Sequence, residues 1–199
     1  TLSLNEFVKI MKLQKINNFV LMGIFIGLGF LSKYAAVYFI ICLFLYYFID
    51  KKFRVIFSKN LLGFFISFLC LLILLLPNLI WNLNNNWITI QHTSDNINLV
   101  NLDLSLYRGV QFLIIQVFML GPFLFLGYLF NFKNLTINEN QKILLIFSVP
   151  IFCIVCVEAI VVRANANWAA PALISYFIFL YGSLGTAKIL FFRINFFIN

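Results

Sequence analysis

Residues 19–49 read FVLMGIFIGLGFLSKYAAVYFIICLFLYYFI, an apolar run of 31 residues interrupted only around Ser32-Lys33-Tyr34. As one helix this run would measure about 46 Å, against about 30 Å for the hydrocarbon core of a bilayer. Basic clusters lie on both sides of it, at 9–15 and at 51–59. A single crossing would put these clusters in opposite compartments, against the positive-inside tendency. The run therefore predicts a hairpin of two short membrane helices, at about 19–32 and 35–49, with Lys33 in the turn.

The composition of the whole chain points to the same class of protein. Hydrophobic residues make up 63% of the chain and charged residues 10%, whereas a soluble domain is about 25% charged. The formal net charge is +8, but the basic residues flank the apolar runs, as the topology rule for membrane proteins requires. The lipid bilayer is therefore the expected partner, and nucleic acid is not.

Four further apolar runs predict the rest of the fold. We place spans at about 61–81, 107–130, 143–162 and 168–187, after a first segment, 1–18, that is an interfacial helix or the tail of a preceding loop. The chain is then one all-α, polytopic transmembrane bundle of about six spans over residues 1–199, with both ends in the cytoplasm. This orientation leaves 11 of the 14 basic residues on the cytoplasmic side. The opposite face keeps three: Lys33, Arg108 and Arg163.

Polar and aromatic side chains gather on that opposite face in two stretches. One reads Trp81-Asn82-Leu-Asn-Asn-Asn-Trp87-Ile-Thr-Ile-Gln-His92, and the other reads Arg163-Ala-Asn165-Ala-Asn167-Trp168-Ala-Ala-Pro171. Arg and Lys form charge-assisted hydrogen bonds with a lipid phosphate, while Trp and Asn suit a sugar ring. The alternatives are an interfacial Trp belt, a snorkelling Lys33, headgroup contacts of the arginines and a solvent-facing His92. The hypothesis is a site for a sugar carried on a lipid phosphate.

Two polar residues lie inside predicted spans. Glu158 is either a functional carboxylate or the ion-pair partner of Arg163 or Arg108, and Gln116 faces the protein interior as part of a site or as a link between helices. Cys153-Ile-Val-Cys156 has CxxC spacing without a second ligand pair, so we expect no metal site there. The sequence indicates no definite cofactor and leaves a divalent cation open.

Four motifs, in order, resemble one family. They are Gly27-Leu-Gly-Phe-Leu-Ser-Lys33-Tyr34, Pro77-Asn-Leu-Ile-Trp81-Asn82 followed by Trp87 and His92, Gln116 with Gly121-Pro122, and Asn167-Trp168-Ala-Ala-Pro171. The chain resembles the bacterial glycosyltransferase family 39 proteins, relatives of the dolichyl-phosphate-mannose protein mannosyltransferases and of the aminoarabinose lipid A transferase.

The resemblance implies a GT-C enzyme of the bacterial inner membrane. Such an enzyme passes a sugar, with inversion, from a polyprenyl-phosphate donor to lipid A or to a protein on the periplasmic face. Lys33 would contact the donor phosphate, with Arg108 and Arg163 on the same face. The sugar and acceptor cavity would be lined or supported by Trp81, Asn82, Trp87, His92, Asn165, Asn167 and Trp168.

The resemblance also implies where the catalytic group lies. In this family the catalytic acid lies in a first periplasmic loop, which the residues before 19 do not contain. We therefore expect the chain to be the C-terminal part of a longer enzyme, with its catalytic residues still to be identified. The alternatives are a transporter or flippase of a lipid-linked saccharide, favoured by Glu158 and the Pro-broken spans, and an inactive remnant.

Overall fold

The computed structural model describes residues 1–97, 104–131, 137–162, 164–183 and 188–198, and their secondary structure is all helical. The chain divides into two units, residues 1–96 and residues 97–199. Each unit has its own buried apolar side chains and is described by itself.

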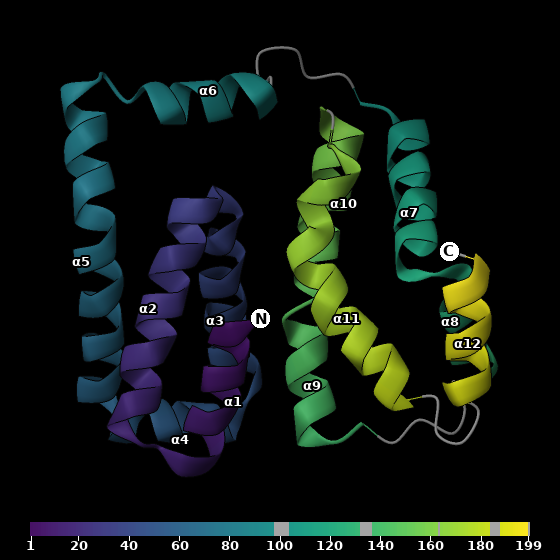
Figure 1. Ribbon diagram of the computed structural model, residues 1–199, viewed down its shortest axis with the longest axis horizontal. Helices are drawn as coiled ribbons and strands as arrows, with labels where there is room; N and C mark the ends of the chain where they lie inside the picture. Colours follow the sequence, from purple (N-terminus) through teal and green to yellow (C-terminus); the bar gives the residue numbers. More distant parts are fainter. Residues whose placement is uncertain (98–103, 132–136, 163, 184–187, 199) are drawn as a thin grey trace. The chain divides into compact units, whose positions relative to one another are not determined.

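The first unit contains six α-helices and one short 3-10 helix. They are α1 (Leu2–Leu13), α2 (Ile16–Ser32), η1 (Tyr34–Ala36), α3 (Val37–Ile49), α4 (Lys51–Lys59), α5 (Leu61–Asn84) and α6 (Ile88–Ile97). Helices α4 and α6 lie across opposite ends of α5 (Figure 1). The first unit therefore has two ends. Lys33, which directly follows α2, lies at the α6 end, and α4 lies at the opposite end.

Small residues bring α2 and α5 into close contact. A Cβ atom added to Gly23 would fall on the backbone carbonyl of Ser67, and one added to Gly27 would lie 2.9 Å from a methyl carbon of Leu74. Without large side chains at these positions, the two helix backbones approach directly, as is common between membrane helices.

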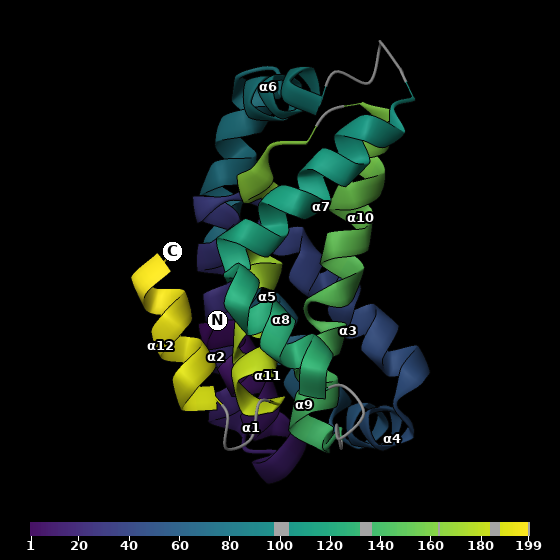
Figure 2. The ribbon, with the colours of Figure 1, turned by 90° about the vertical axis from the view of Figure 1, so that its right-hand side faces the viewer.

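Helix α1 runs back along α2 (Figures 1 and 2). Phe7 and Ile10 are fully buried, so the apolar face of α1 is covered by protein. The segment is helical, as an interfacial helix would be, but this face is not left free for lipid. The side chain of Glu6, also buried, accepts a hydrogen bond of 2.6 Å from the Lys9 ammonium.

An aromatic cluster holds α1, α3, α4 and α5 together at the α4 end. The ring of Phe53 in α4 lies 5.2 Å from Phe7, 5.2 Å from Tyr46 and 5.9 Å from Phe64. Edge-to-face and stacked ring pairs at these separations are favourable beyond the area they bury.

The second unit contains six α-helices and one described 3-10 helix. They are α7 (Leu106–Leu120), α8 (Pro122–Asn131), α9 (Glu139–Ile146), α10 (Val149–Val161), η3 (Ala166–Ala169), α11 (Ala170–Ser183) and α12 (Lys188–Ile198). Helices α7 and α10 lie next to each other, and α12 lies beside α8 (Figure 2). The predicted span 107–130 breaks at Gly121, whose φ of 102° favours glycine. A Cβ there would meet the side-chain amide of Asn195 in α12.

The described residues include two helical segments long and apolar enough to cross a membrane. They are Leu61–Asn84 and Glu139–Val161, with mean hydropathies of 2.5 and 2.7 over an 18-residue window. Helices α3 and α4, bent by 108°, count as a third segment if they are taken as one span. The chain is thus a membrane protein with two to three candidate spans, where the sequence predicts about six. The difference arises because α2 has only 17 residues and because Gly121 interrupts the helix that begins at Leu106.

Candidate sugar-phosphate site

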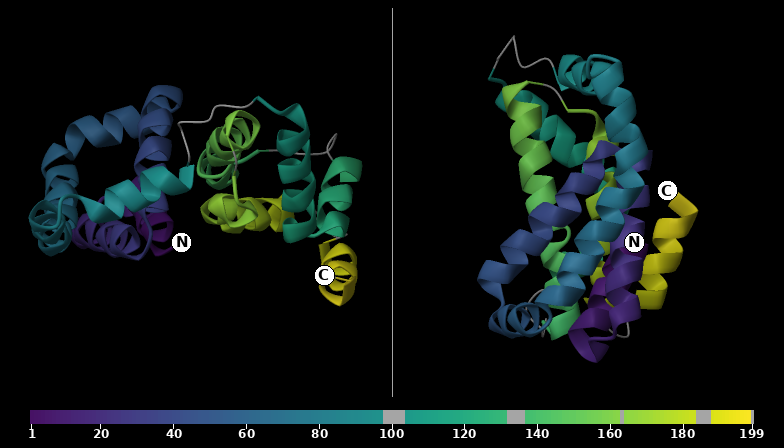
Figure 3. Two further views of the ribbon diagram at one scale, coloured as in Figure 1. Left: turned by 90° about the horizontal axis from the view of Figure 1, so that it is seen from above. Right: turned by 90° about the vertical axis from the view of Figure 1, so that its left-hand side faces the viewer.

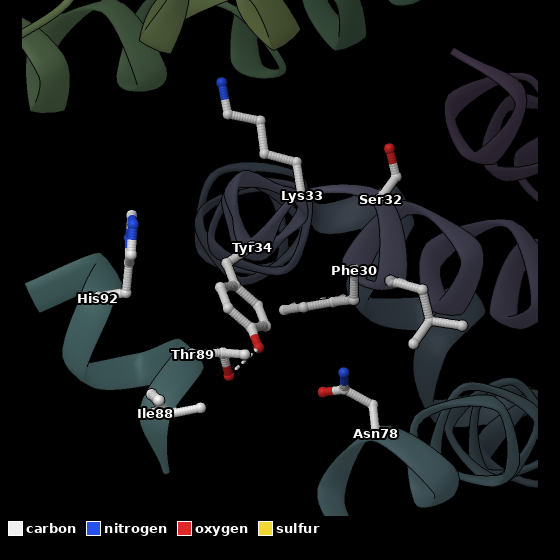
Figure 4. Close-up of a pocket in the computed structure, with 9 residues that line it drawn as sticks. Phe30, Ser32, Lys33, Tyr34, Asn78, Ile88, Thr89 and His92 are labelled. Carbon is white, nitrogen blue, oxygen red and sulfur yellow. Dashed lines mark hydrogen bonds between the residues drawn. The ribbon is translucent and has the colours of Figure 1, made fainter. Parts of the chain in front are cut away.

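A cavity of about 710 Å³ lies in the first unit, where α2, η1, α5 and α6 meet. It is lined by Phe30, Leu31, Ser32, Lys33, Tyr34, Asn78, Ile88, Thr89 and His92. Figure 4 shows the Lys33 and His92 side chains extending to the same side, away from Asn78, with Tyr34 and Thr89 facing each other. The cavity therefore combines a cation, an imidazole, hydroxyl groups and an amide beside apolar walls.

Lys33 occupies the turn between α2 and η1. Helix α2 ends at Ser32, and Lys33 has an extended backbone with φ −159° and ψ 130°. Its side chain is exposed, and its ammonium forms no hydrogen bond or ion pair with any residue that the structure describes. The charge is available to an anion in the cavity.

A chain of hydrogen bonds connects the walls of the cavity. Tyr34 Oη lies 2.9 Å from Thr89 Oγ1, and Thr89 Oγ1 donates to Asn82 Oδ1. Asn82 Nδ2 in turn donates to the carbonyl oxygen of Asn78 at 3.0 Å. Because Asn82 is only 2% exposed, its amide connects α5 to α6 from inside the unit.

The corner between α5 and α6 sets the position of α6. Asn86 and Trp87 both have left-handed backbones, with φ of 52° and 58°. The Trp87 N–H donates to the carbonyl oxygen of Asn82 at 2.9 Å. This turn directs α6 across the end of α5 (Figure 3) and brings Thr89 and His92 to the cavity.

The sugar-site residues predicted in this unit do not all line the cavity. His92 lines the cavity with Lys33, whereas Asn82 lies behind the wall as the partner of Thr89. Trp81 and Trp87 are 48% and 39% exposed and are not among the residues that line the cavity. They suit the alternative reading, an interfacial Trp belt.

The site predicted from the sequence lacks four polar residues that line the cavity: Ser32, Tyr34, Asn78 and Thr89. Asn78 could have been found, because it lies one helical turn before Asn82 and shares its face of α5. Thr89 could not, because its position depends on the left-handed corner.

The second unit has a smaller cavity of about 180 Å³. It is lined by Arg108, Gln111, Phe112, Ile115, Ala159, Ala164 and Ala166. A guanidinium nitrogen of Arg108 lies 3.4 Å from the carbonyl oxygen of Ile160. Gln116 is buried, and its Nε2 donates to the carbonyl oxygen of Ala166 at 2.9 Å. Arg108 thus belongs to a different cavity from Lys33.

The remaining residues predicted in this unit surround η3. Asn165 and Asn167 are exposed and Trp168 is partly exposed, and the Trp168 N–H donates to the carbonyl oxygen of Asn165 at 3.0 Å. Arg163 lies outside the described residues. Gln116 contacts this segment through Ala166, so α7 and η3 form one polar region.

Glu158 is half-buried in α10 and forms no ion pair with Arg108. The other partner proposed from sequence, Arg163, lies outside the residues that the structure describes. Within the described parts of the chain, no three His, Cys, Asp or Glu residues are grouped so that they could hold a metal ion.

Comparison with known proteins finds that the first part of the chain is similar to a class of membrane glycosyltransferases. Residues 1–81 match the family described as Dolichyl-phosphate-mannose-protein mannosyltransferase. The matched segment includes Lys33, Tyr34 and Asn78 of the cavity and ends before Thr89 and His92. The resemblance predicted from the sequence motifs is therefore confirmed.

The chain is also similar to the lipid A galacturonosyltransferase RgtD of Rhizobium johnstonii, with 27% identity over 157 residues. The alignment covers 77% of this chain and 32% of the relative, so the chain spans about a third of the length of the curated relative it matches. No solved structure matches the chain.

Proposed function

We propose that this chain is part of a glycosyltransferase that moves a sugar from a polyprenyl-phosphate donor to a lipid or protein acceptor. The observation that carries the proposal is the Lys33 ammonium, which has no partner among the described residues and lines a cavity with hydroxyl and amide groups. Most of this cavity lies within the segment that matches the mannosyltransferase family.

In this proposal, Lys33 binds the donor phosphate. The bond between C1 of the sugar and the phosphate oxygen breaks, and the phosphate leaves with the electron pair while an acceptor oxygen bonds to C1. A cation beside the leaving phosphate stabilises the negative charge that develops on it. Tyr34, Thr89 and Asn78 offer hydrogen bonds to sugar hydroxyls, and His92 extends the polar wall. The base that removes the acceptor proton is assigned to no residue here.

The charge of the cavity bears on which sugar it accepts. No Asp or Glu is among its described lining residues, whereas Lys33 is. A cationic amino sugar would find no carboxylate partner there, and an acidic sugar would be attracted. The relative's name, a galacturonosyltransferase, points the same way. We therefore infer that a neutral or acidic sugar is preferred over an amino sugar.

We further propose a GT-C bundle of about six crossings over residues 1–199, in the bacterial inner membrane with both ends cytoplasmic. The Lys33 cavity then faces the periplasm, as does the polar region of Arg108, Asn165, Asn167 and Trp168. This second region is proposed to contact the acceptor or the donor phosphate, and Arg163 is assigned to it from sequence alone.

Binding of a polyprenyl phosphate to the purified chain in detergent micelles tests the role of Lys33. Lys33→Ala should weaken binding about tenfold or more, because it removes a charge-assisted interaction, and Lys33→Arg should retain most of it. Lys142→Ala is the control, since this lysine of α9 lines neither cavity. Binding by Lys33→Ala equal to that of the unmodified chain would remove the phosphate role.

A further inference from the structure

At the end of the first unit opposite the cavity, exposed lysines lie on α4 and beside it. Lys51 and Lys59 lie on α4, and Lys12 and Lys15 lie at the turn between α1 and α2. We call these four lysines the basic end. They come from segments more than thirty residues apart in the sequence, and a hydrogen bond between Asn60 and Gln14 joins those segments.

Several contacts hold this end in one shape. The Asp50 carboxylate accepts from the Phe53 N–H at 2.8 Å and caps α4, and the Arg54 guanidinium donates to the carbonyl oxygen of Phe48 at 2.8 Å. Asn60 Nδ2 donates to Gln14 Oε1 at 2.9 Å, which connects the end of α4 to the α1–α2 turn. The 108° bend between α3 and α4 is therefore a fixed corner.

The two faces of α4 differ in character. Phe53 and Ile56 are buried in the unit, whereas Lys51, Val55 and Lys59, four residues apart, form one exposed stripe. Val55 is 47% exposed between the two lysines. A basic stripe with an apolar centre is the pattern of a helix that lies at a lipid–water interface.

The residues on either side of α4 indicate the depth at which this helix lies in the membrane. Phe48 and Ile49, just before α4, are 58% and 57% exposed, and Leu61 and Leu62, just after it, are 57% and 71% exposed. In a membrane protein such side chains face acyl chains. The lysines that separate them along the chain are therefore at the level of lipid headgroups.

We propose that the basic end is a binding surface for anionic phospholipid headgroups. Charge complementarity selects this partner. The two acidic residues near it are engaged, because Glu6 is buried beside Lys9 and Asp50 caps α4. Lysine chains at this depth reach phosphate oxygens while their methylene groups stay on apolar surface. The proposal is independent of which sugar the cavity binds.

Electron spin resonance with spin-labelled phosphatidylglycerol and phosphatidylcholine tests this surface, using the full chain in vesicles. The unmodified chain should hold phosphatidylglycerol selectively, and added salt should reduce the selectivity. In Lys51→Gln/Lys59→Gln the selectivity should fall by roughly twofold to fivefold per lysine. Lys12→Gln/Lys15→Gln should act similarly from the other segment.

The matched control is Lys142→Gln/Arg193→Gln, which removes the same charge from the second unit and should leave most of the selectivity. Equal losses in this control and in the α4 variant would show that net charge alone governs lipid selectivity and would overturn the proposal. Unchanged selectivity in both lysine pairs of the basic end, with unchanged helix content by circular dichroism, would overturn it as well.

Discussion

Gly23 allows the backbones of α2 and α5 to touch, because the Ser67 carbonyl oxygen occupies the space that a Cβ would need. A methyl group at this position can be accommodated only if the helices separate. We expect Gly23→Ala to lower the free energy of unfolding by about 1–3 kcal/mol, the usual cost of overpacking. Thermal unfolding of the purified chain in detergent, followed by circular dichroism, measures this loss.

Gly182→Ala is the control, because no described atom outside its chain neighbours and its own helix backbone lies within 4 Å of the added Cβ. The same substitution in helix α11 should leave the unfolding temperature unchanged or raise it, since alanine favours helix. Equal unfolding temperatures for the Gly23 and Gly182 variants would contradict the close contact between α2 and α5.

Single residues also show how far sequence reasoning extends. A charged residue inside an apolar run of 31 residues predicts a helix break, and α2 indeed ends at Ser32. Trp81 and Asn82 were assigned together to the sugar cavity, but neighbouring side chains diverge by about 100° around a helix. Asn82 is accordingly buried while Trp81 is exposed. Which of the two faces inward depends on helix packing that composition does not reveal.

Helix α6 depends on a few polar contacts for its place at the cavity. Thr89 takes part in two of them, with Tyr34 and with the buried Asn82. Thr89→Val keeps the size of the side chain but removes the hydroxyl, so Asn82 Oδ1 loses its donor. We expect a loss of about 1–3 kcal/mol in stability and weaker binding of a polyprenyl phosphate, measured by thermal unfolding and by titration.

Thr89→Ser, which keeps the hydroxyl, should behave like the unmodified chain in both assays. If the valine and serine variants are indistinguishable, the hydroxyl does not hold α6 in place. The sequence does not predict the direction of α6. That direction depends on the left-handed backbone of Asn86 and Trp87, and residues of these types could adopt many other turns. By contrast, α5 was predicted well, since its apolar run is long and continuous.

At the scale of the whole molecule, the six-crossing topology is open to a direct test. It requires the two polar regions to share a compartment although their residues are far apart in the sequence. In a background with the four native cysteines replaced by serine, single cysteines can be introduced on each side. Those at Lys33, His92 and Asn167 should react with a membrane-impermeant maleimide added outside spheroplasts, and those at Lys12, Lys51 and Lys142 should not.

If the cysteines introduced at Lys33 and Asn167 were labelled from different sides of the membrane, a common site would be excluded. The helical class and the membrane location were accessible from composition, because they depend on sums over many residues. The number of spans was not, because helix length depends on single breaks such as Gly121. The assignment of Lys33 and Arg108 to one phosphate site remains a prediction, since they line separate cavities.

The exposed Trp81 and Trp87 have a practical consequence. The chain has three tryptophans, and these two flank the corner that carries α6, while the aromatic cluster around Phe53 contains phenylalanine and tyrosine. Replacing Trp168 with phenylalanine would leave an intrinsic fluorophore pair at the α5–α6 corner alone, beside the helix that carries Thr89 and His92 of the cavity. Its emission wavelength would then report, without any attached dye, when an amphiphile enters beside Lys33.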